Sequence, residues 1–363
     1  MNIKFKEQTS SIDYPLLLFT IVLSLFGLVM VYDSSVVQAL KDFNDSYYYI
    51  RQQIIWVVIG LLSGGFFTFF DYHNFKKLAF LMLLFSLVLL VAVFIPGLGI
   101  SGGGAHRWLN LRLAVIQPTE IIKLTGVIYL ATIFEKGVRL KPFLILLTIV
   151  TFITAVLQKD LGSTVVFATT AVMIYFVAGG AWWHFLLLLP AGLLTVGGLI
   201  LTSSYRFQRV LAFLNPFSDT QGFTYHISQV LIALGSGGLM GVGLGQSRQK
   251  FAYIPEVTTD SIFAIVGEEL GFLGSLVLIG AFLGLILRGF EIARHTGDNF
   301  GKILATGLTV WLGIQTVINL SSMVALVPLT GVPLPFISYG GSALVANLTA
   351  VGILLNISKD NKS

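Results

Sequence analysis

The chain contains no cysteine among its 363 residues, and charged residues make up only 11% of it. The lack of cysteine excludes disulfide bonds, thiol nucleophiles and thiolate metal sites. A soluble domain carries about 25% charged residues, so the composition also excludes an ordinary soluble protein. The five histidines are scattered without a HExxH pattern, which argues against a zinc site. The phosphate-loop pattern GxxxxGK(S/T) is absent, and nothing predicts a nucleic-acid partner.

Hydrophobic residues make up 55% of the chain, and the mean hydropathy is +0.88. A helix needs about 20 apolar residues to cross a bilayer. We therefore expect an all-α polytopic membrane protein, a single membrane domain over residues 1–363 with about ten transmembrane helices. The first apolar run has no small-residue cleavage site, so it is predicted to be a retained helix. The expected spans are 14–32, 52–70, 78–96, 118–134, 143–157, 161–178, 183–202, 261–287, 302–327 and 339–357.

The distribution of Lys and Arg places both termini in the cytoplasm, with loops 97–117 and 203–260 outside the cell. Loop 203–260, between helices 7 and 8, is too long for a simple connection and rich in aromatic and apolar residues. Short interfacial helices are expected in it. Cations on the outer side oppose the usual charge bias, which predicts an anionic ligand there. These cations are Arg107, Arg112, Arg206, Arg209, Arg248 and Lys250.

Three carboxylates lie where loop 203–260 enters the eighth span: Asp260, Glu268 and Glu269. Burying a carboxylate in hydrocarbon is costly unless it is paired or hydrated, so a role is expected for each. Asp260 is either a helix N-cap or a general base, and the two roles are compatible. Adjacent helical residues project about 100° apart, so Glu268 and Glu269 are predicted not to face one partner. A packing or hydrogen-bonding role is expected for them.

Further charges lie at the ends of other spans. Glu120 and Lys123 are spaced i, i+3 and share one helix face. They form either a self-neutralising packing pair or the polar wall of an outward-facing cavity. Asp160 is either the cap of the sixth span or a membrane-level ligand of a cation or loop. The prolines of segment 327–342 predict a rigid re-entrant turn that forms part of a cavity wall.

Long segments of the chain resemble the SEDS family, which comprises FtsW, RodA and SpoVE. The resemblance runs in order across nearly the whole chain and favours the FtsW/SpoVE branch. Three departures are Ser261 in place of an aromatic residue, Lys159 in place of proline, and His106 where a basic residue is common. The matching segments include GAHRWLNL (104–111), QPTEIIKL (117–124), LQKDLGSTVV (157–166), GLGQSRQKFAYIPEVTTD (243–260), GEELGF (267–272) and PLPFISYGGS (333–342).

The resemblance implies a peptidoglycan glycosyltransferase that polymerises lipid II at the outer face of the bacterial cytoplasmic membrane. It also implies a class B penicillin-binding protein as transpeptidase partner, within the divisome or elongasome. The essential aspartate of the family falls on Asp260, and its other charged motif residues fall on Glu120, Lys123 and Asp160. A septal, cell-division role is expected.

The reaction inverts an α-linked donor into a β-1,4 polymer, which requires a base and a cationic site for the leaving diphosphate. Asp260 is predicted to be the base. A divalent cation, Mg or Mn, is left open, and a lipid II flippase or a divisome scaffold are the alternatives. Predicted substrate-binding residues are Glu120, Lys123, Arg206, Arg209, Arg248, Lys250 and Arg107, with Asp160, Glu256, Ser338 and Glu268 in support.

Overall fold

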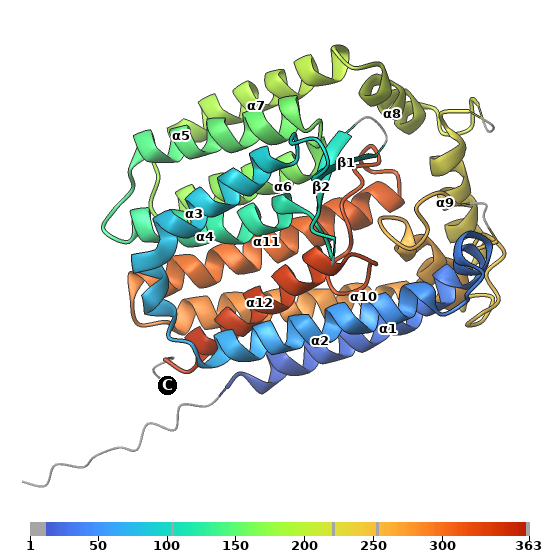
Figure 1. Ribbon diagram of the computed structural model, residues 1–363, viewed down its shortest axis with the longest axis horizontal. Coiled ribbons are helices and arrows are strands. Elements are labelled where there is room, and N and C mark those ends of the chain that lie inside the picture. Colours follow the sequence, from blue (N-terminus) through green and yellow to red (C-terminus); the bar gives the residue numbers. More distant parts are fainter. Residues whose placement is uncertain (1–11, 103–104, 113, 220–221, 252–253, 361–363) are drawn as a thin grey trace, which may run out of the picture.

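A computed structural model describes residues 12–102, 105–112, 114–219, 222–251 and 254–360. Each of the ten predicted spans coincides with a helix, and these helices run side by side in one bundle (Figure 1). They are α1 (Tyr14–Phe43), α2 (Tyr48–Phe69), η1 with α3 (Tyr72–Asn74, Phe75–Ala92), α4 (Pro118–Phe134), α5 with the π-helix η2 (Leu140–Thr151, Phe152–Leu157), α6 (Leu161–Val177), α7 (Trp183–Leu201), α10 (Ile262–His295), α11 (Asn299–Met323) and α12 (Gly341–Ser358).

Eight of these helices are long and apolar enough to cross a membrane, and the apolar α6 is shorter. Helices satisfy their backbone hydrogen bonds internally, which a lipid environment requires. The prediction of a helical polytopic membrane protein is confirmed. Helices α11 and α12 are largely buried in the middle of the bundle, whereas α7, all of which is described, buries no residue.

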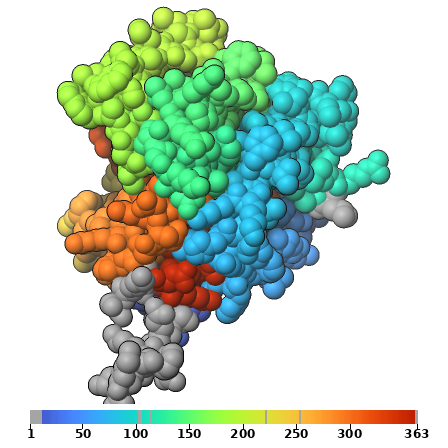
Figure 2. Space-filling model, turned by 90° about the vertical axis from the view of Figure 1, so that its left-hand side faces the viewer, coloured from blue at the N-terminus to red at the C-terminus, as the bar shows by residue number. Residues whose placement is uncertain are grey.

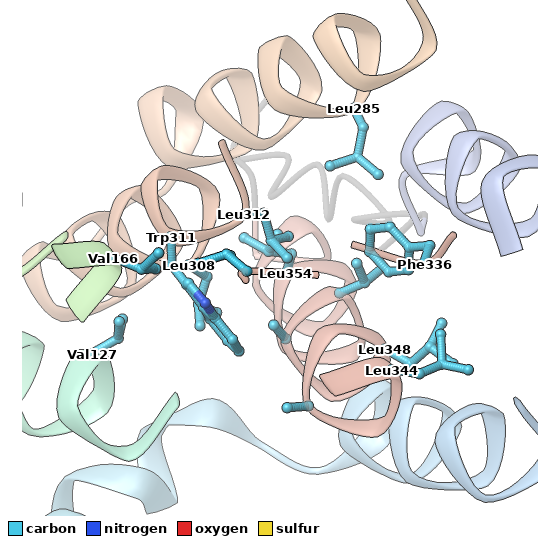
Figure 3. Packing of buried hydrophobic residues seen from close by; sticks show 14 of the residues in the cluster. Val127, Val166, Leu285, Leu308, Trp311, Leu312, Phe336, Leu344, Leu348 and Leu354 are labelled. Carbon is cyan, nitrogen blue, oxygen red and sulfur yellow. The ribbon is translucent and has the colours of Figure 1, made fainter. Parts of the chain in front are cut away.

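The centre of the bundle is packed with apolar side chains. Trp311 of α11 is completely buried and lies among Leu308, Leu312 and residues of neighbouring helices (Figure 3). Leu344, Leu348 and Leu354 line the neighbouring α12 in the same view. Burial of large apolar side chains of this kind fixes the positions of the two central helices.

The two ends of the described chain lie together. The amide of Asp13 donates to Ser358 Oγ (3.2 Å), which joins the start of α1 to the end of α12. Tyr72 N donates to Asn356 Oδ1 (3.0 Å), and Tyr72 Oη donates to Asp298 Oδ1 (2.6 Å). In the end-on view, the red end of α12 accordingly lies between orange and blue segments of the chain (Figure 2).

Loop 97–117 contains a small antiparallel sheet that the sequence analysis did not predict. Its strands are β1 (Gly99–Gly102), β2 (Ala105–Asn110) and β3 (Val115–Ile116), in the order β1-β2-β3. Gly99 pairs with Leu109, which in turn pairs with Ile116, and Leu109 is buried. The strands are short, of four, six and two residues, so they carry little of the alternating pattern by which a strand is identified.

Loop 203–260 contains two short helices, α8 (Ser204–Leu214) and α9 (Tyr225–Ser236), and their place at the membrane interface stays a prediction. The arginines of α8 fasten it to the bundle through backbone carbonyls. Arg206 donates to Ala155 O (2.6 Å) and Leu199 O (3.2 Å), and Arg209 donates to Leu329 O (2.9 Å). The first carbonyl belongs to the π-helix η2, where the backbone spacing departs from the α-helix.

Helix α10 is broken at Gly271, whose φ of 68° and ψ of −166° are not helical. The glycine-rich segment 238–243 pairs with the backbone groups around the break. A Cβ atom at Gly241 would lie 2.1 Å from Glu269 O, so only glycine allows this approach. Three of the bonds are Val242 N to Glu268 O (3.0 Å), Gly243 N to Glu269 O (3.0 Å) and Phe272 N to Gly238 O (2.9 Å).

Candidate active site

A cavity of about 630 Å³ lies at the end of the bundle opposite the joined ends of α1 and α12. We call it the main cavity. The start of α2, the sheet, α8 and segments 256–260 and 331–343 form its walls, so the predicted wall function of segment 327–342 is confirmed. Its polar lining includes Gln52, Arg107, Asn110, Arg112, Gln117, Arg209, Glu256, Thr259 and Asp260.

Asp260 lies deep in the main cavity, with 5% of its surface exposed. Its Oδ1 accepts a hydrogen bond from Thr259 Oγ1 (3.3 Å), and its backbone carbonyl accepts one from Asn319 Nδ2 (2.8 Å). The N-cap of α10 is the next residue, Ser261. Asp260 is therefore not the N-cap of α10, and its carboxylate is available to a ligand, as the role of general base requires.

The electrostatic environment of Asp260 combines burial with nearby cations. Burial raises the pKa of the Asp260 carboxyl, while the guanidinium groups of Arg209 and Arg107 and the Thr259 hydrogen bond partly oppose this increase. Asp260 precedes the first residue of α10, so it lies outside the spanning helix. A carboxylate with a raised pKa is a better general base near neutral pH.

Gly331 lies beside both Asp260 and Arg209. A Cβ atom there would lie 3.8 Å from Asp260 Oδ2 and 3.9 Å from an Arg209 guanidinium nitrogen, and its φ is +71°. The Arg209 guanidinium also stacks 4.7 Å from the ring centroid of Tyr205. The carboxylate and the cation are thus separated by a space that a side chain at position 331 would enter.

We expect Gly331→Ala to lower the rate of the reaction because its methyl group occupies this space. The left-handed backbone adds about 1–2 kcal/mol of strain. Gly97→Ala is the matched control, since Gly97 has φ +85° and open space around it. Thermal unfolding should show similar destabilisation of both variants, with activity lost only in Gly331→Ala. Equal activity in the two would contradict a reactive space at this position.

Arg107 reaches the main cavity from strand β2 and approaches Asp160. Its Nε lies 3.9 Å from Asp160 Oδ2, and one of its terminal nitrogens donates to Lys159 O (3.3 Å). Asp160 Oδ1 accepts from Ser163 N (3.2 Å), so Asp160 caps α6 as one alternative predicted. Arg206 lies nearby but binds backbone carbonyls, and burial together with Arg107 lowers its pKa. Of Arg107 and Arg206, it is therefore Arg107 that lines the main cavity.

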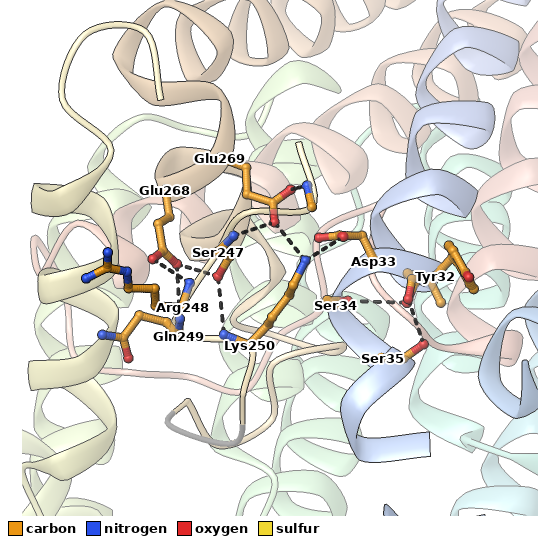
Figure 4. A network of polar contacts seen from close by, with 12 residues as sticks. Tyr32, Asp33, Ser34, Ser35, Ser247, Arg248, Gln249, Lys250, Glu268 and Glu269 are labelled. Atoms are coloured by element: carbon orange, nitrogen blue, oxygen red, sulfur yellow. Dashed lines mark hydrogen bonds and ion pairs between the residues drawn. The ribbon is translucent and has the colours of Figure 1, made fainter. Parts of the chain in front are cut away.

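Lys250 and Arg248 are not among the described residues that line the main cavity. Lys250 Nζ instead lies 2.7 Å from Asp33 Oδ1 and 3.1 Å from Glu269 Oε1, with 7% of its side chain exposed (Figure 4). These two cations were predicted to bind the diphosphate, but they do not lie at the main cavity, so that prediction is wrong. The carboxylate of Asp33, on α1, draws Lys250 away from the cavity.

Glu268 and Glu269 both bind the one segment 245–250, contrary to the prediction that they could not face one partner (Figure 4). The segment wraps around α10, so side chains that diverge from the helix still meet it. Peptide N–H groups provide most of the donors, which offsets the cost of burying both carboxylates. Glu269 accepts from Gly245 N (3.0 Å) and Ser247 N (3.0 Å), and Glu268 from Ser247 Oγ (2.5 Å), Arg248 N (3.0 Å) and Gln249 N (3.4 Å).

We expect Lys250→Met to destabilise the protein, because it leaves Asp33 and Glu269 close together without their cation. The loss should be smaller than the about 3–5 kcal/mol for a fully buried pair, since the Asp33 side chain is 18% exposed. Arg51→Met is the control: Arg51 pairs with Asp45 at the surface, and such pairs contribute little. Equal melting temperatures for the two variants would contradict a stabilising role of Lys250.

Glu120 and Lys123 form a buried ion pair (2.8 Å) and are not among the described residues of the main cavity. Lys123 Nζ also donates to Gln315 Oε1 (2.7 Å), which accepts from Trp311 Nε1 (3.0 Å). The side chain of Lys123 is 2% exposed and that of Glu120 is 0% exposed. Of the two alternatives, the structure shows the self-neutralising packing pair, and the polar-wall prediction is wrong.

The structure adds one residue, Asn319, that was not selected from the sequence. Asn319 of α11 donates to both Asp260 O and Val332 O (2.8 Å each), so it joins two walls of the cavity. A buried amide within a predicted span was the available signal. Ser338 and Glu256, by contrast, were selected from the sequence as supporting residues. Ser338 is buried and accepts from Leu334 N (2.8 Å), which stabilises the turn before α12. Glu256 lines the cavity and accepts from Thr259 Oγ1 (3.0 Å).

The fold and this cavity define a polytopic helical membrane protein with a buried carboxylate and arginines at one end of the bundle. The model of a family described as "Cell cycle protein", which groups FtsW, RodA and SpoVE, matches residues 14–363. The chain belongs to this family. The resemblance noted from the sequence is thereby confirmed.

Relatives of known name cover almost the whole chain. The "Probable peptidoglycan glycosyltransferase FtsW" of Geobacter metallireducens is 38% identical over 99% of this chain and 98% of its own length. The "Stage V sporulation protein E" of Bacillus subtilis is 40% identical over 97% of this chain and 98% of its own length.

Two solved structures share the fold. A chain from a peptidoglycan synthase complex, described as coordinating polymerization and crosslinking, matches with a TM-score of 0.80 and 27% identity over 96% of this chain and 98% of that one. The rod shape determining protein RodA of Thermus thermophilus matches with a TM-score of 0.72 and 26% identity, over 97% and 98%.

Proposed function

We propose that this protein is a peptidoglycan glycosyltransferase that polymerises lipid II into β-1,4 glycan strands. The observation that carries the proposal is the buried Asp260 carboxylate, which shares one cavity with Arg209 and Arg107. An inverting transfer from a lipid diphosphate needs a base and a cationic site in reach of each other. The names of relatives that match the chain over nearly its full length support this reaction.

Asp260 is the residue proposed to accept the proton of the acceptor 4-hydroxyl as that oxygen attacks the anomeric carbon of the donor. The bond from this carbon to the diphosphate breaks in the same step, which inverts the α-linkage to β. Arg209 and Arg107 are positioned to stabilise the negative charge that develops on the leaving diphosphate. Arg112, also on the cavity wall, is a third cation available to the diphosphate.

A divalent cation would find few protein ligands here. The described residues contain no group of three histidine or acidic side chains that could hold a metal. Asp260 and Glu256, both hydrogen-bonded to Thr259, are two carboxylates in the cavity. One or two carboxylates plus substrate phosphates are a usual ligand set for Mg²⁺. The set fits a cation that arrives with the substrate and shields its phosphate charge.

The proposed orientation has both termini in the cytoplasm and the main cavity outside the cell. It is supported by the joined ends of α1 and α12, which lie at the end of the bundle opposite the cavity. The proposed partner is a class B penicillin-binding protein that crosslinks the glycan, in the divisome or elongasome. The match to a chain of a peptidoglycan synthase complex supports a partner of this kind.

A lipid II flippase is the second candidate, since it would also bind a lipid diphosphate. At the end away from the cavity, charged residues are tied to one another: Arg288 binds Asp13 (2.6 Å), and Lys76 binds Glu135 (2.5 Å). A transporter needs access from both sides of the membrane, and these pairs favour the polymerase.

The experiment that separates the two candidates is polymerisation of lipid II by the purified protein in detergent, with and without the transpeptidase partner. No membrane is present, so flipping contributes nothing to the product. Glycan strands on a gel, absent from the Asp260→Asn sample, are the expected result. Absence of product from wild-type protein with its partner would overturn the proposed function.

A further inference from the structure

A second cavity, of about 320 Å³, adjoins the main cavity. Tyr205, Arg209 and Glu256 line both, so they form the wall between them. His226 of α9 also lines the second cavity. This histidine therefore lies in the immediate surroundings of the proposed reactive site, although it takes no part in the mechanism above.

His226 makes a direct contact with the residue that follows Asp260. Its Nε2 lies 2.6 Å from the hydroxyl oxygen of Ser261, which is fully buried. Ser261 is the N-cap residue of α10, but its side chain makes no capping hydrogen bond within the described chain. A serine in this position usually accepts a bond from a free amide of the helix. Here the hydroxyl bonds to the imidazole instead.

The bond suits a neutral imidazole. Burial and the Arg209 guanidinium lower the pKa of His226 to about 4, and the opposing effect of Glu256 is smaller. A neutral ring can accept the Ser261 proton or donate its own, so the bond forms with either tautomer of His226. On the opposite side, Asn319 of α11 binds the Asp260 carbonyl (2.8 Å). The Asp260–Ser261 pair is thus held by two side chains from two different helices, at the carbonyl of Asp260 and at the hydroxyl of Ser261.

We propose that His226 is a positioning residue for the polymerisation reaction: it holds Ser261, and through it the Asp260 carboxylate, toward the main cavity. This inference rests on the function proposed above. It also explains the serine at position 261, where the family resemblance leads one to expect an aromatic residue. The hydrogen bond between His226 of α9 and Ser261 fixes the start of α10.

The test compares His226→Ala, Ser261→Ala and the double variant in the lipid II polymerisation assay. We expect kcat to fall about 10- to 100-fold in each single variant, as misplaced reactive groups cause, with KM unchanged. The double variant should be no slower than the slower single variant, because both remove the same bond. His226→Gln, whose amide can reach the hydroxyl, should recover part of kcat.

Ser228→Ala is the matched control, since it removes a buried hydroxyl of α9 that bonds within its own helix to Tyr225 O (2.9 Å). It should keep the wild-type kcat. The proposal is overturned if both single variants polymerise at the wild-type rate, or if their losses multiply in the double variant. Thermal unfolding gives the fraction of each variant that is folded. The proposal is also overturned if kcat divided by that fraction equals the wild-type value. Lack of product from wild-type protein would instead overturn the proposed function.

Discussion

Asp260→Asn should abolish measurable polymerisation of lipid II while the protein keeps its fold and its partner. Asparagine has nearly the same shape but cannot accept the proton of the acceptor hydroxyl. Loss of a general base typically costs about 10²–10⁴-fold in rate. Among the described side chains, the hydrogen bond to the carboxylate is the one from Thr259, a contact of 3.3 Å, so the substitution should disturb little of the structure. The measurement is strand formation from purified lipid II, with thermal unfolding in detergent to establish folding.

Asp219→Asn is the matched control, because it makes the same chemical change in the same loop. Asp219 binds the amide of Gly222 at the surface and does not belong to the described cavity wall. It should polymerise at the wild-type rate. Polymerisation at that rate by Asp260→Asn would remove Asp260 from the mechanism.

The pH dependence of the wild-type enzyme gives a second measurement of the same assignment. The base works when ionised, so the rate should fall as the pH decreases through the pKa of Asp260. Burial raises that pKa, which places the decrease above the pH of about 4 expected for a free aspartate. Arg209 lowers the pKa, so Arg209→Gln should move the decrease to higher pH. A shift to lower pH would contradict the proposed electrostatics.

Lys123→Met should destabilise the protein by about 3–5 kcal/mol, the cost of leaving a buried charge without its partner. Glu120 is fully buried, and Lys123 is its only ion-pair partner among the described residues. Methionine also removes the donor to Gln315. The melting temperature in detergent should fall strongly, and activity should fall with the fraction of folded protein.

The double variant Glu120→Gln/Lys123→Met tests whether the pair is structural. It removes both charges, and apolar or neutral replacements of buried ion pairs are often tolerated. We expect it to recover much of the stability and of the polymerisation rate. Recovery of stability without recovery of the rate would show that the pair takes part in the reaction. Lys76→Met, in a more exposed pair with Glu135, should have a smaller effect on stability.

The helices and the carboxylate at the reactive site were predictable from the sequence, because both follow from local chemistry. Apolar runs of sufficient length must form helices in a bilayer, whatever surrounds them. Carboxylates at the entry to such a run are conspicuous by their cost, which drew attention to Asp260 together with Glu268 and Glu269. The family resemblance then singled out Asp260 as the base. The small sheet of β1, β2 and β3 was not predictable in this way, since its short strands are defined by pairing with each other.

The sequence by itself determined which residue types were available for the reaction: a few carboxylates at the ends of apolar spans and several cations in the connecting loops. Only the tertiary structure decided which cations meet the carboxylate. Arg209 and Arg107 reach the main cavity, whereas Lys250 is bound by Asp33, 217 positions away in the chain. Such a contact depends on the path of a long loop over the helices, which no local pattern specifies. A charge binds the opposite charge that the fold brings nearest, so the role of each cation was settled by packing.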